Sequence, residues 1–379
     1  MRFPHPAIPL ACVLLASSLL GCNNGGTRKT RPVEEPQTLR VETLTATTNN
    51  RGVYKFDIEV KEGERFQAIF EEDGKAYLAT ESLIDPAGET ALDWQDWLYS
   101  DYSLTEALYA TEFVSTLNWP VREEDGPIAP GTWTIEGSAT SISGDPKSGA
   151  AITATLLYRS DDDLQKGTIH AIIAYCTGLR EDSDIVAGIE AGVAYWQQLY
   201  ASWGIDLTVE YSDIDVDPAL PDTYKGVTAY QDLLDTKEGY PLLMVIGDLI
   251  ADDNYIYGEA GAIPGPMIGT PISAVEVSWI AHAGANGQFS DWEIGVLGET
   301  MAHETGHYLG MFHPVEMDWN YWDAVSDTDA CTSTGSCERN LGKNLMFPYS
   351  LCYGASNCES QDELTDGQIG IMQRYAGVE

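Results

Sequence analysis

Positive charge is scarce in this chain of 379 residues. Lysine and arginine together number 20, against 59 aspartates and glutamates, so the formal net charge is −39. A surface this acidic repels nucleic acid and anionic lipid headgroups, which excludes both as partners. We interpret the acidity as an aid to solubility outside the cell.

Long apolar runs are also missing. The run at residues 7–20 is too short to span a bilayer, and no other segment is long and apolar enough. It follows Met1-Arg2 and predicts a signal peptide over residues 1–22. Its end, Leu19-Leu20-Gly21-Cys22, resembles the lipobox of bacterial lipoproteins, in which Cys22 carries the lipid. We therefore expect an exported bacterial protein, either a cell-envelope lipoprotein held to the membrane only by this anchor or an extracellular one. Residues 23–38 are polar and predict a flexible tether.

Cysteines are few and unevenly placed. Four of the seven crowd near the C-terminus: Cys331, Cys337, Cys352 and Cys358. In an exported protein they predict two disulfides, with three connectivities open. A zinc knuckle is the alternative, although paired C-x-x-C units are absent. Cys176 is expected to be a buried thiol.

Histidine is scarce, but three of the six occur within eleven residues as H-E-x-x-H-x-x-G-x-x-H. On a helix, His303 and His307 lie on one face and can hold one metal ion. Gly310 can adopt the left-handed conformation that ends a helix, which would return His313 as a third ligand. Three neutral imidazoles indicate a catalytic zinc site with one open position, beside which Glu304 can reach a bound water. A chance match is about one in 10^5, so a helix with surface histidines is the weaker interpretation.

The residues before this motif predict the helix that carries it. Ser290 and Glu293 form a capping-box start. Leu297, Met301 and Tyr308 recur on one side of the expected helix, which we predict to face the core.

The histidine motif resembles that of the metzincin clan of zinc peptidases. That clan has a tight turn containing methionine below the metal, and Met346 in Asn344–Phe347 matches it. Residues 323–328, 364–368 and 261–266 resemble the pappalysin family within the clan. The resemblance implies a zinc cofactor, a protein or peptide substrate, and Tyr349 as a helper in stabilising the oxyanion. It also implies the pairings Cys331–Cys352 and Cys337–Cys358.

The rest of the chain predicts a multidomain protein. Alternating apolar residues between turn signals over residues 39–160 indicate an all-β sandwich or jelly roll as an accessory domain. Residues 165–379 show the strand and helix order of an α/β (α+β) metzincin-like catalytic domain. Within it, residues 272–278 are expected to be the edge strand that pairs with an extended substrate.

Several other side chains have competing interpretations. We expect four aromatic residues to pack in a core, with an exposed binding surface as the alternative: Trp94, Trp97, Tyr99 and Tyr102. His170 and His282 are expected to be structural. Asp323 or Asp327 is expected to support the lower subdomain through backbone contacts near the methionine turn.

Together these features predict a zinc endopeptidase in which Glu304 is the general base. One alternative is a surface binding or adhesion lipoprotein with a vestigial peptidase domain, and another is a different zinc hydrolase such as an amidase. Calcium has no support, because Pro218 stands where an EF-hand loop beginning at Asp213 needs glycine.

Overall fold

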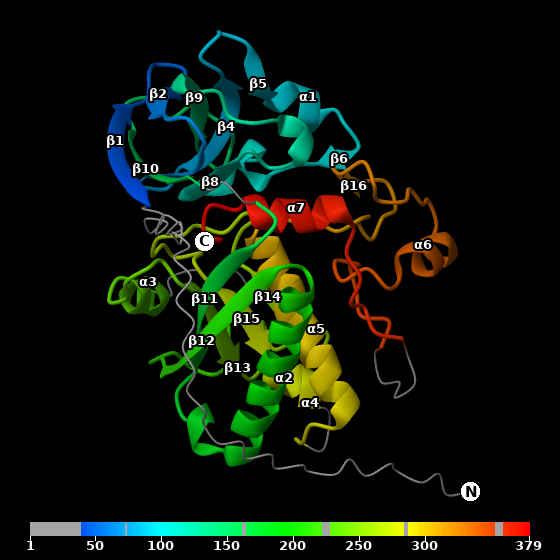
Figure 1. Ribbon diagram of the computed structural model, residues 1–379. Coiled ribbons are helices and arrows are strands. Elements are labelled where there is room, and N and C mark those ends of the chain that lie inside the picture. Colours follow the sequence, from blue (N-terminus) through cyan, green and yellow to red (C-terminus); the bar gives the residue numbers. More distant parts are fainter. Residues whose placement is uncertain (1–38, 73, 161–163, 222–227, 284–286, 353–358) are drawn as a thin grey trace, which may run out of the picture. The chain divides into compact units, whose positions relative to one another are not determined.

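The computed structural model describes residues 39–72, 74–160, 164–221, 228–283, 287–352 and 359–379. Gln37–Glu379 form one compact unit (Figure 1). The predicted signal peptide, its Cys22 and the tether lie outside the described residues. Within the described ranges, no helix is long and apolar enough to cross a membrane.

The N-terminal strands form two antiparallel sheets, which confirms the predicted all-β region. One sheet has the order β1-β10-β3-β8, and the other has the order β2-β9-β4-β5 with β7 paired to β4. Alternate residues of β2 are buried, and Phe56 of β2 stacks on Phe70 of β3 with ring centroids 5.8 Å apart. The core of this region therefore lies between the sheets. Their strands are β1 (Arg40–Thr47), β2 (Val53–Val60), β3 (Glu64–Glu72), β4 (Tyr77–Ile84), β5 (Thr90–Asp93), β7 (Thr111–Glu112), β8 (Val114–Trp119), β9 (Gly131–Thr140) and β10 (Ala151–Ser160).

A mixed five-stranded sheet with helices follows, as predicted for the α/β part. Its order is β12-β11-β13-β15-β14, and β14 alone runs antiparallel to its neighbour. Its strands are β11 (Gly167–Tyr175), β12 (Ile205–Asp213), β13 (Leu242–Gly247), β14 (Gly258–Ala260) and β15 (Val275–Ser278). The helices are α2 (Ser183–Ser202), α3 (Thr228–Leu234), α4 (Trp279–Ala283), α5 (Asp291–Tyr308), α6 (Thr334–Leu341) and α7 (Asp366–Arg374).

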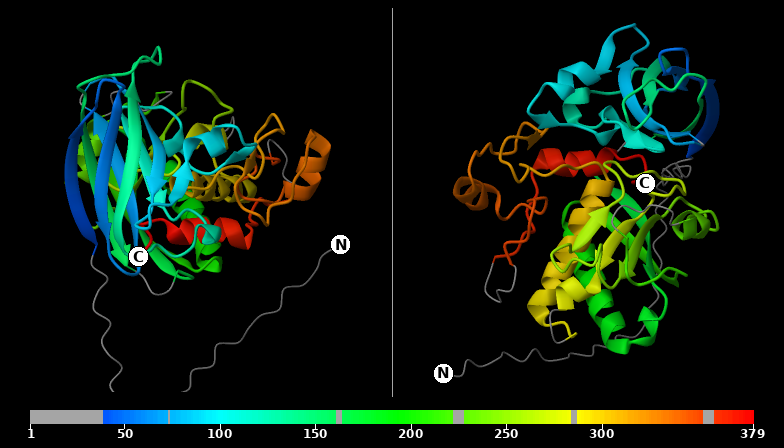
Figure 2. Two further views of the ribbon diagram at one scale, coloured as in Figure 1. Left: turned by 90° about the horizontal axis from the view of Figure 1, so that it is seen from above. Right: turned by 180° about the vertical axis from the view of Figure 1, so that it is seen from behind.

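Helices α2 and α5 lie side by side along this sheet (Figures 1 and 2). Glycine permits their close approach. A Cβ atom on Gly192 would lie 2.7 Å from Leu297, and one on Gly298 would lie 2.6 Å from Tyr195. The Tyr200 hydroxyl adds a hydrogen bond of 3.0 Å to the carbonyl oxygen of Ala302. These contacts fix the helix that carries the histidine motif.

The expected edge strand at residues 272–278 is wrong. Its observed strand, β15, pairs with β13 on one side and β14 on the other, and all four of its residues are buried. The sheet instead ends at β14, whose residues 258–260 carry no long alternating pattern that would mark a strand in the sequence.

Buried polar side chains join the sandwich to the α/β part. Gln67 of β3 donates to the carbonyl oxygen of Gly265 and accepts from the amide of Met267. Arg159 of β10 is only 1% exposed and donates to the carbonyl oxygen of Ala376 over 2.7 Å. Because such bonds replace those to water, the outer face of the first sheet can be buried without alternation. A division into separate domains near residue 160 stays a prediction.

The expectation that the aromatic residues near α1 (Trp94–Leu98) pack in the core is wrong for two of them. Tyr99 is 83% exposed and Tyr102 is 51% exposed, while Trp94 and Trp97 are half-buried. Helix α1 has no buried residue. Tyr99 and Tyr102 follow it at the surface, and the chain enters the core again only at Leu104.

Candidate metal centre

Helix α5 begins and packs as its sequence predicts. The amide of Ser290 donates to the Glu293 carboxylate over 2.6 Å, which closes the capping box. Leu297, Met301 and Tyr308 are buried. The opposite side of the helix carries His303 and His307 into the candidate site.

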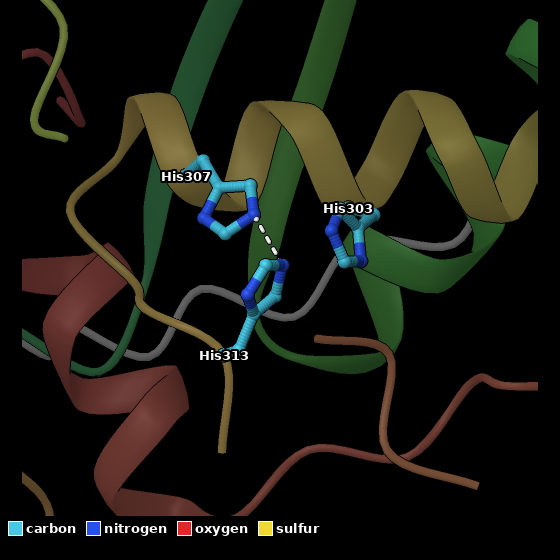
Figure 3. A group of neighbouring side chains, drawn as sticks. All are labelled: His303, His307 and His313. Atoms are coloured by element: carbon cyan, nitrogen blue, oxygen red, sulfur yellow. Dashed lines mark hydrogen bonds between the residues drawn. The ribbon is translucent and has the colours of Figure 1, made fainter. Parts of the chain in front are cut away.

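The chain reverses just after this helix. Gly310 has φ +106°, a conformation that a residue with a side chain adopts only under strain. The amide of Met311 bonds back to the carbonyl oxygen of Gly306, and His313 returns beside His307. The turn therefore gathers the three imidazoles of the motif, whose ligand nitrogens all lie within 4.8 Å of one another (Figure 3).

Each of these imidazoles has an acceptor at Nδ1. His303 bonds to the carbonyl oxygen of Leu345 and His307 to that of Met311, both over 2.7 Å. His313 bonds to the Glu316 carboxylate over 2.9 Å. Carbonyl and carboxylate oxygens only accept, so Nδ1 carries the hydrogen and Nε2 keeps its lone pair in the neutral ring. These bonds fix the tautomer that a metal ligand needs.

The spacing of the His307 and His313 Nε2 atoms fits a zinc ion. Those of His307 and His313 lie 3.1 Å apart, along the dashed line in Figure 3. Two lone pairs this close repel each other unless a cation lies between them. Ligand nitrogens at about 2.0–2.1 Å in a tetrahedron are about 3.3–3.4 Å apart, close to this value. Burial also lowers the pKa of His303 to about 3 and that of His307 well below its usual range, which keeps both rings neutral as ligands.

Glu304 lies beside this cluster and is not one of its three ligands. Burial and, after it, the nearby Glu259 carboxylate raise the pKa of the Glu304 carboxyl to about 8, and a backbone hydrogen bond at Ala260 opposes both. Strand β14 passes close to it, because a Cβ atom on Gly258 would lie 2.5 Å from Glu304 Cγ. Glycine at this position lets the edge strand run directly beside Glu304.

The methionine turn lies beneath the histidines. Met346 is fully buried, and a Cβ atom on Gly306 would lie 2.7 Å from its Sδ atom. The amide of Met346 donates to Asn344 Oδ1 over 2.9 Å. Asn344 in turn donates to Gln368 Oε1 over 2.7 Å, and Gln368 donates to Asp323 Oδ2 over 3.0 Å. This Met-turn network is buried, so it holds the turn rigidly.

The two aspartates act differently in this region. Asp327 accepts from the amide of Gly367 over 2.8 Å, which is the expected kind of backbone contact. Asp323 has a backbone hydrogen bond at Val325 and also accepts from the side chains of Gln368 and Thr328. Burial raises the pKa of Asp323 to about 8.

Tyr349 lines the same cleft as Glu304, but its hydroxyl makes a hydrogen bond to another residue. It donates to Glu338 Oε1 over 3.0 Å. Burial, then the hydrogen bond to Glu338 and the Glu338 charge, raise the pKa of Tyr349 to about 12. The hydroxyl is therefore a proton donor and not a base.

The expected disulfide pairings are wrong, because Cys331 is bonded to Cys337. Their Cα atoms lie 5.2 Å apart, since the first turn of α6 brings Cys337 back to the chain before it. Cys352 is also disulfide-bonded. Cys358 lies outside the described residues. Cys176 is a buried free thiol, as expected.

The candidate metal centre opens into a cleft of about 510 Å³. Beyond His303, it is lined by residues from β14, α5, the chain after His313 and the segment of the methionine turn, among them Gly258, Thr300, Glu304, Met317, Phe347 and Tyr349. The cleft therefore leaves open space beside His303 and Glu304, bordered by strand, helix and turn.

The sequence interpretation missed two acidic residues at this site. Glu316 follows His313 by three residues, so its position was a usable signal. Glu259 approaches Glu304 only through the pairing of β14 with β15, which no local pattern reveals. His282 is buried and structural, as expected, and it bonds to the Thr300 hydroxyl over 2.9 Å.

No protein-family model matches this sequence, and no curated protein sequence matches it. Among solved structures, the chain is similar to archaemetzincin from Methanopyrus kandleri, with 13% identity and a TM-score of 0.33 over 55% of this chain and 95% of that one. It is also similar to metalloproteinase-II from Bacteroides fragilis, with 13% identity and a TM-score of 0.27 over 45% of this chain and 59% of that one.

Proposed function

We propose that this protein is a zinc-dependent endopeptidase. The observation that carries the proposal is the cluster of His303, His307 and His313, which present Nε2 lone pairs to one point beside Glu304. Three imidazoles leave one position for water, as catalytic zinc sites do. Two segments with pappalysin-like sequence also meet in the structure, where Gln368 bonds to Asp323. This contact supports the proposal that the chain is related to that family.

A zinc ion bound by the three histidines would acidify a water molecule and polarise the scissile carbonyl. Glu304 acts as the general base, taking the proton of the attacking water and passing it to the leaving amine. The positive charge of a zinc ion held there would lower the pKa of Glu304 and favour the ionised carboxylate that this role needs. It would act against burial and Glu259, which raise that pKa. Tyr349 is the proposed donor to the developing oxyanion, after its hydroxyl leaves Glu338.

Strand β14 is the proposed docking edge for the substrate. It ends the sheet and passes directly beside Glu304. An extended peptide that pairs with such an edge satisfies its backbone groups and holds its own carbonyl groups in a fixed register. This places the scissile bond by backbone contacts and leaves side-chain selection to the cleft.

The proposed location is the bacterial cell envelope, with Cys22 as a lipid anchor. This proposal is supported by the lipobox-like sequence Leu19 to Cys22 and by the polar residues that follow. Mass spectrometry of the mature protein should find an acyl group on Cys22, and Cys22→Ser should release the protein from membranes. A mature wild-type protein without lipid would exclude the anchor.

The function is tested by zinc removal and restoration. The purified protein is incubated with a peptide library before chelation, after chelation and after adding back one equivalent of zinc. Mass spectrometry should find internal cuts that disappear on chelation and return with zinc. A metal-free protein that cleaves at the original rate would contradict the proposal.

A further inference from the structure

One loop connects the candidate cleft to a group of exposed aromatic residues, some of which are distant from the cleft residues in the sequence. Residues 315–322 form a tight loop closed by a bridge between Val315 and Trp322, and the amide of Glu316 bonds to the carbonyl oxygen of Tyr321. Met317 in this loop is exposed and lines the cleft. Trp322 at the end of the loop lines a second cavity. The loop is therefore a continuous path between the two.

Aromatic rings follow this path, and we call five of them the aromatic strip: Trp319, Tyr321, Trp322, Tyr102 and Tyr109. Trp319 contacts Tyr349 of the cleft, with ring centroids 6.3 Å apart. Trp322 lies 6.2 Å from Tyr102 by the same measure. The pKa of Tyr109 is raised, chiefly by burial and to a smaller extent by Tyr321. Tyr102, Tyr109 and Tyr321 are all exposed.

The second cavity has a volume of about 310 Å³ and a fixed frame. Here β6 (Tyr102–Ser103) pairs in parallel with β16 (Trp322–Asp323). Arg122 lies over the Trp97 ring and donates to the carbonyl oxygen of Ala324 over 2.9 Å. The strand pairing and the Arg122 hydrogen bond thus hold the aromatic side chains that line the cavity. Glu124 adds a carboxylate to the lining.

Such a surface is matched to one kind of partner. Large exposed aromatic side chains gathered in one place indicate an interaction site. The net charge of −39 disfavours nucleic acid and anionic lipid and favours a basic ligand. Continuity with the cleft indicates that the partner is the molecule that also enters the cleft. An unfolded polypeptide supplies apolar and basic side chains together.

We propose that the aromatic strip and the second cavity form an additional binding surface for polypeptide substrates, which holds a segment of unfolded chain outside the cleft. The proposal rests on the proposed peptidase function and adds a substrate class to it. Unfolded proteins with basic and aromatic segments should bind better than short peptides that occupy the cleft alone.

Kinetics with two substrates test the proposal. One substrate is reduced and alkylated lysozyme, which is basic and unfolded. The other is a quenched fluorescent peptide of about eight residues, or roughly 27 Å when extended, copied from a site that the enzyme cuts in that protein. The variant Tyr102→Ser/Tyr321→Ser should raise KM for the protein about tenfold with kcat unchanged, because binding alone is lost. Its kinetics with the peptide should stay at the wild-type values.

The matched control is Tyr240→Ser, which removes an exposed aromatic ring outside the strip. This variant should keep the wild-type KM and kcat with both substrates. The single variants Tyr102→Phe and Tyr321→Phe keep the rings and should retain the wild-type KM. An equal change with both substrates, or no change with either, would overturn the proposal, and a thermal melt checks that each variant is folded.

Direct binding separates this proposal from the peptidase function. Fluorescence anisotropy compares labelled unfolded lysozyme on Glu304→Gln and on Glu304→Gln with the two strip substitutions added. Affinity should fall about tenfold in the second protein even if no cleavage is ever observed. Equal affinities would overturn the binding surface, whereas lack of turnover by the wild type with both substrates would overturn only the function.

Discussion

The imidazole of His303 donates from Nδ1 to the carbonyl oxygen of Leu345 over 2.7 Å, which ties the first histidine of the motif to the residue before Met346. A main-chain carbonyl oxygen cannot be removed by substitution, so the acceptor of this bond is present whatever residue stands at position 345. The orientation of His303 therefore depends on how well the methionine turn itself is held. Helix and turn together form one unit around the candidate metal centre.

The Met-turn network supplies the first prediction. Asn344→Ala leaves the Met346 amide without its acceptor and removes one hydrogen-bond donor from Gln368 Oε1, inside a buried region. We expect a loss of about 1–3 kcal/mol in the free energy of unfolding, because hydrogen bonds to buried polar groups are lost. Turnover should fall about tenfold as the Leu345 carbonyl group shifts. Denaturant unfolding and peptide assays measure both, and Asn320→Ala, an exposed site with only local bonds, is the control. Unchanged stability would show that the network does not hold the turn.

Glu316 provides the second prediction, since its carboxylate accepts from His313 Nδ1. Glu316→Gln keeps an acceptor but removes the charge that makes the imidazole a stronger donor of electrons. Zinc affinity, measured by competition with a chelator, should weaken about tenfold, at the low end for loss of an outer partner. Asp318→Asn in the same loop removes one charge away from the histidine and should have no such effect. Equal losses in the two variants would indicate a general charge effect instead.

Asp323 leads to a prediction about pH. Its folded-state pKa of about 8 lies above its ordinary value, so the folded protein holds a proton that the unfolded chain has lost. Between about pH 4 and pH 8 the free energy of unfolding should therefore fall as pH rises. Asp323→Asn keeps an acceptor for Gln368 and Thr328 and should remove this part of the slope. Urea unfolding at several pH values compares the two proteins, and parallel curves would contradict the assignment.

The disulfide between Cys331 and Cys337 gives the fourth prediction. Peptide mapping without reduction should recover these two residues in one linked fragment. Replacing both with serine should cost about 2–3 kcal/mol by the loop-entropy estimate for so short a loop. The bond packs beside Phe347 of the methionine turn, so turnover should fall with stability. A fragment linking Cys331 to Cys352 would show a different pairing.

Local patterns predicted much of this molecule, and contacts between distant segments account for the rest. The helix of His303 and His307, its capping box and its buried side follow from spacing alone. Gly310 was predicted because a left-handed turn favours glycine, and Met346 was predicted from the resemblance to the metzincin clan. The edge strand was misplaced because β14 covers the outer side of β15. Strand β14 has only residues 258–260, too few to show a strand pattern in the sequence. Tyr102 was misplaced for a related reason, since an exposed and a buried aromatic residue look alike in a sequence. The disulfide was assigned by resemblance, and proximity along the chain was the better guide.

The central claim is that His303, His307 and His313 hold zinc while Glu304 moves the proton. The most direct measurement determines zinc content and peptide turnover together on purified Glu304→Gln, with His313→Ala as the contrasting variant. Glu304→Gln should retain close to one zinc ion per chain and lose about 10²–10⁴ in turnover, because only the base is gone. His313→Ala should lose zinc affinity and activity together. Wild-type turnover by Glu304→Gln, or full zinc affinity and activity in His313→Ala, would contradict the claim.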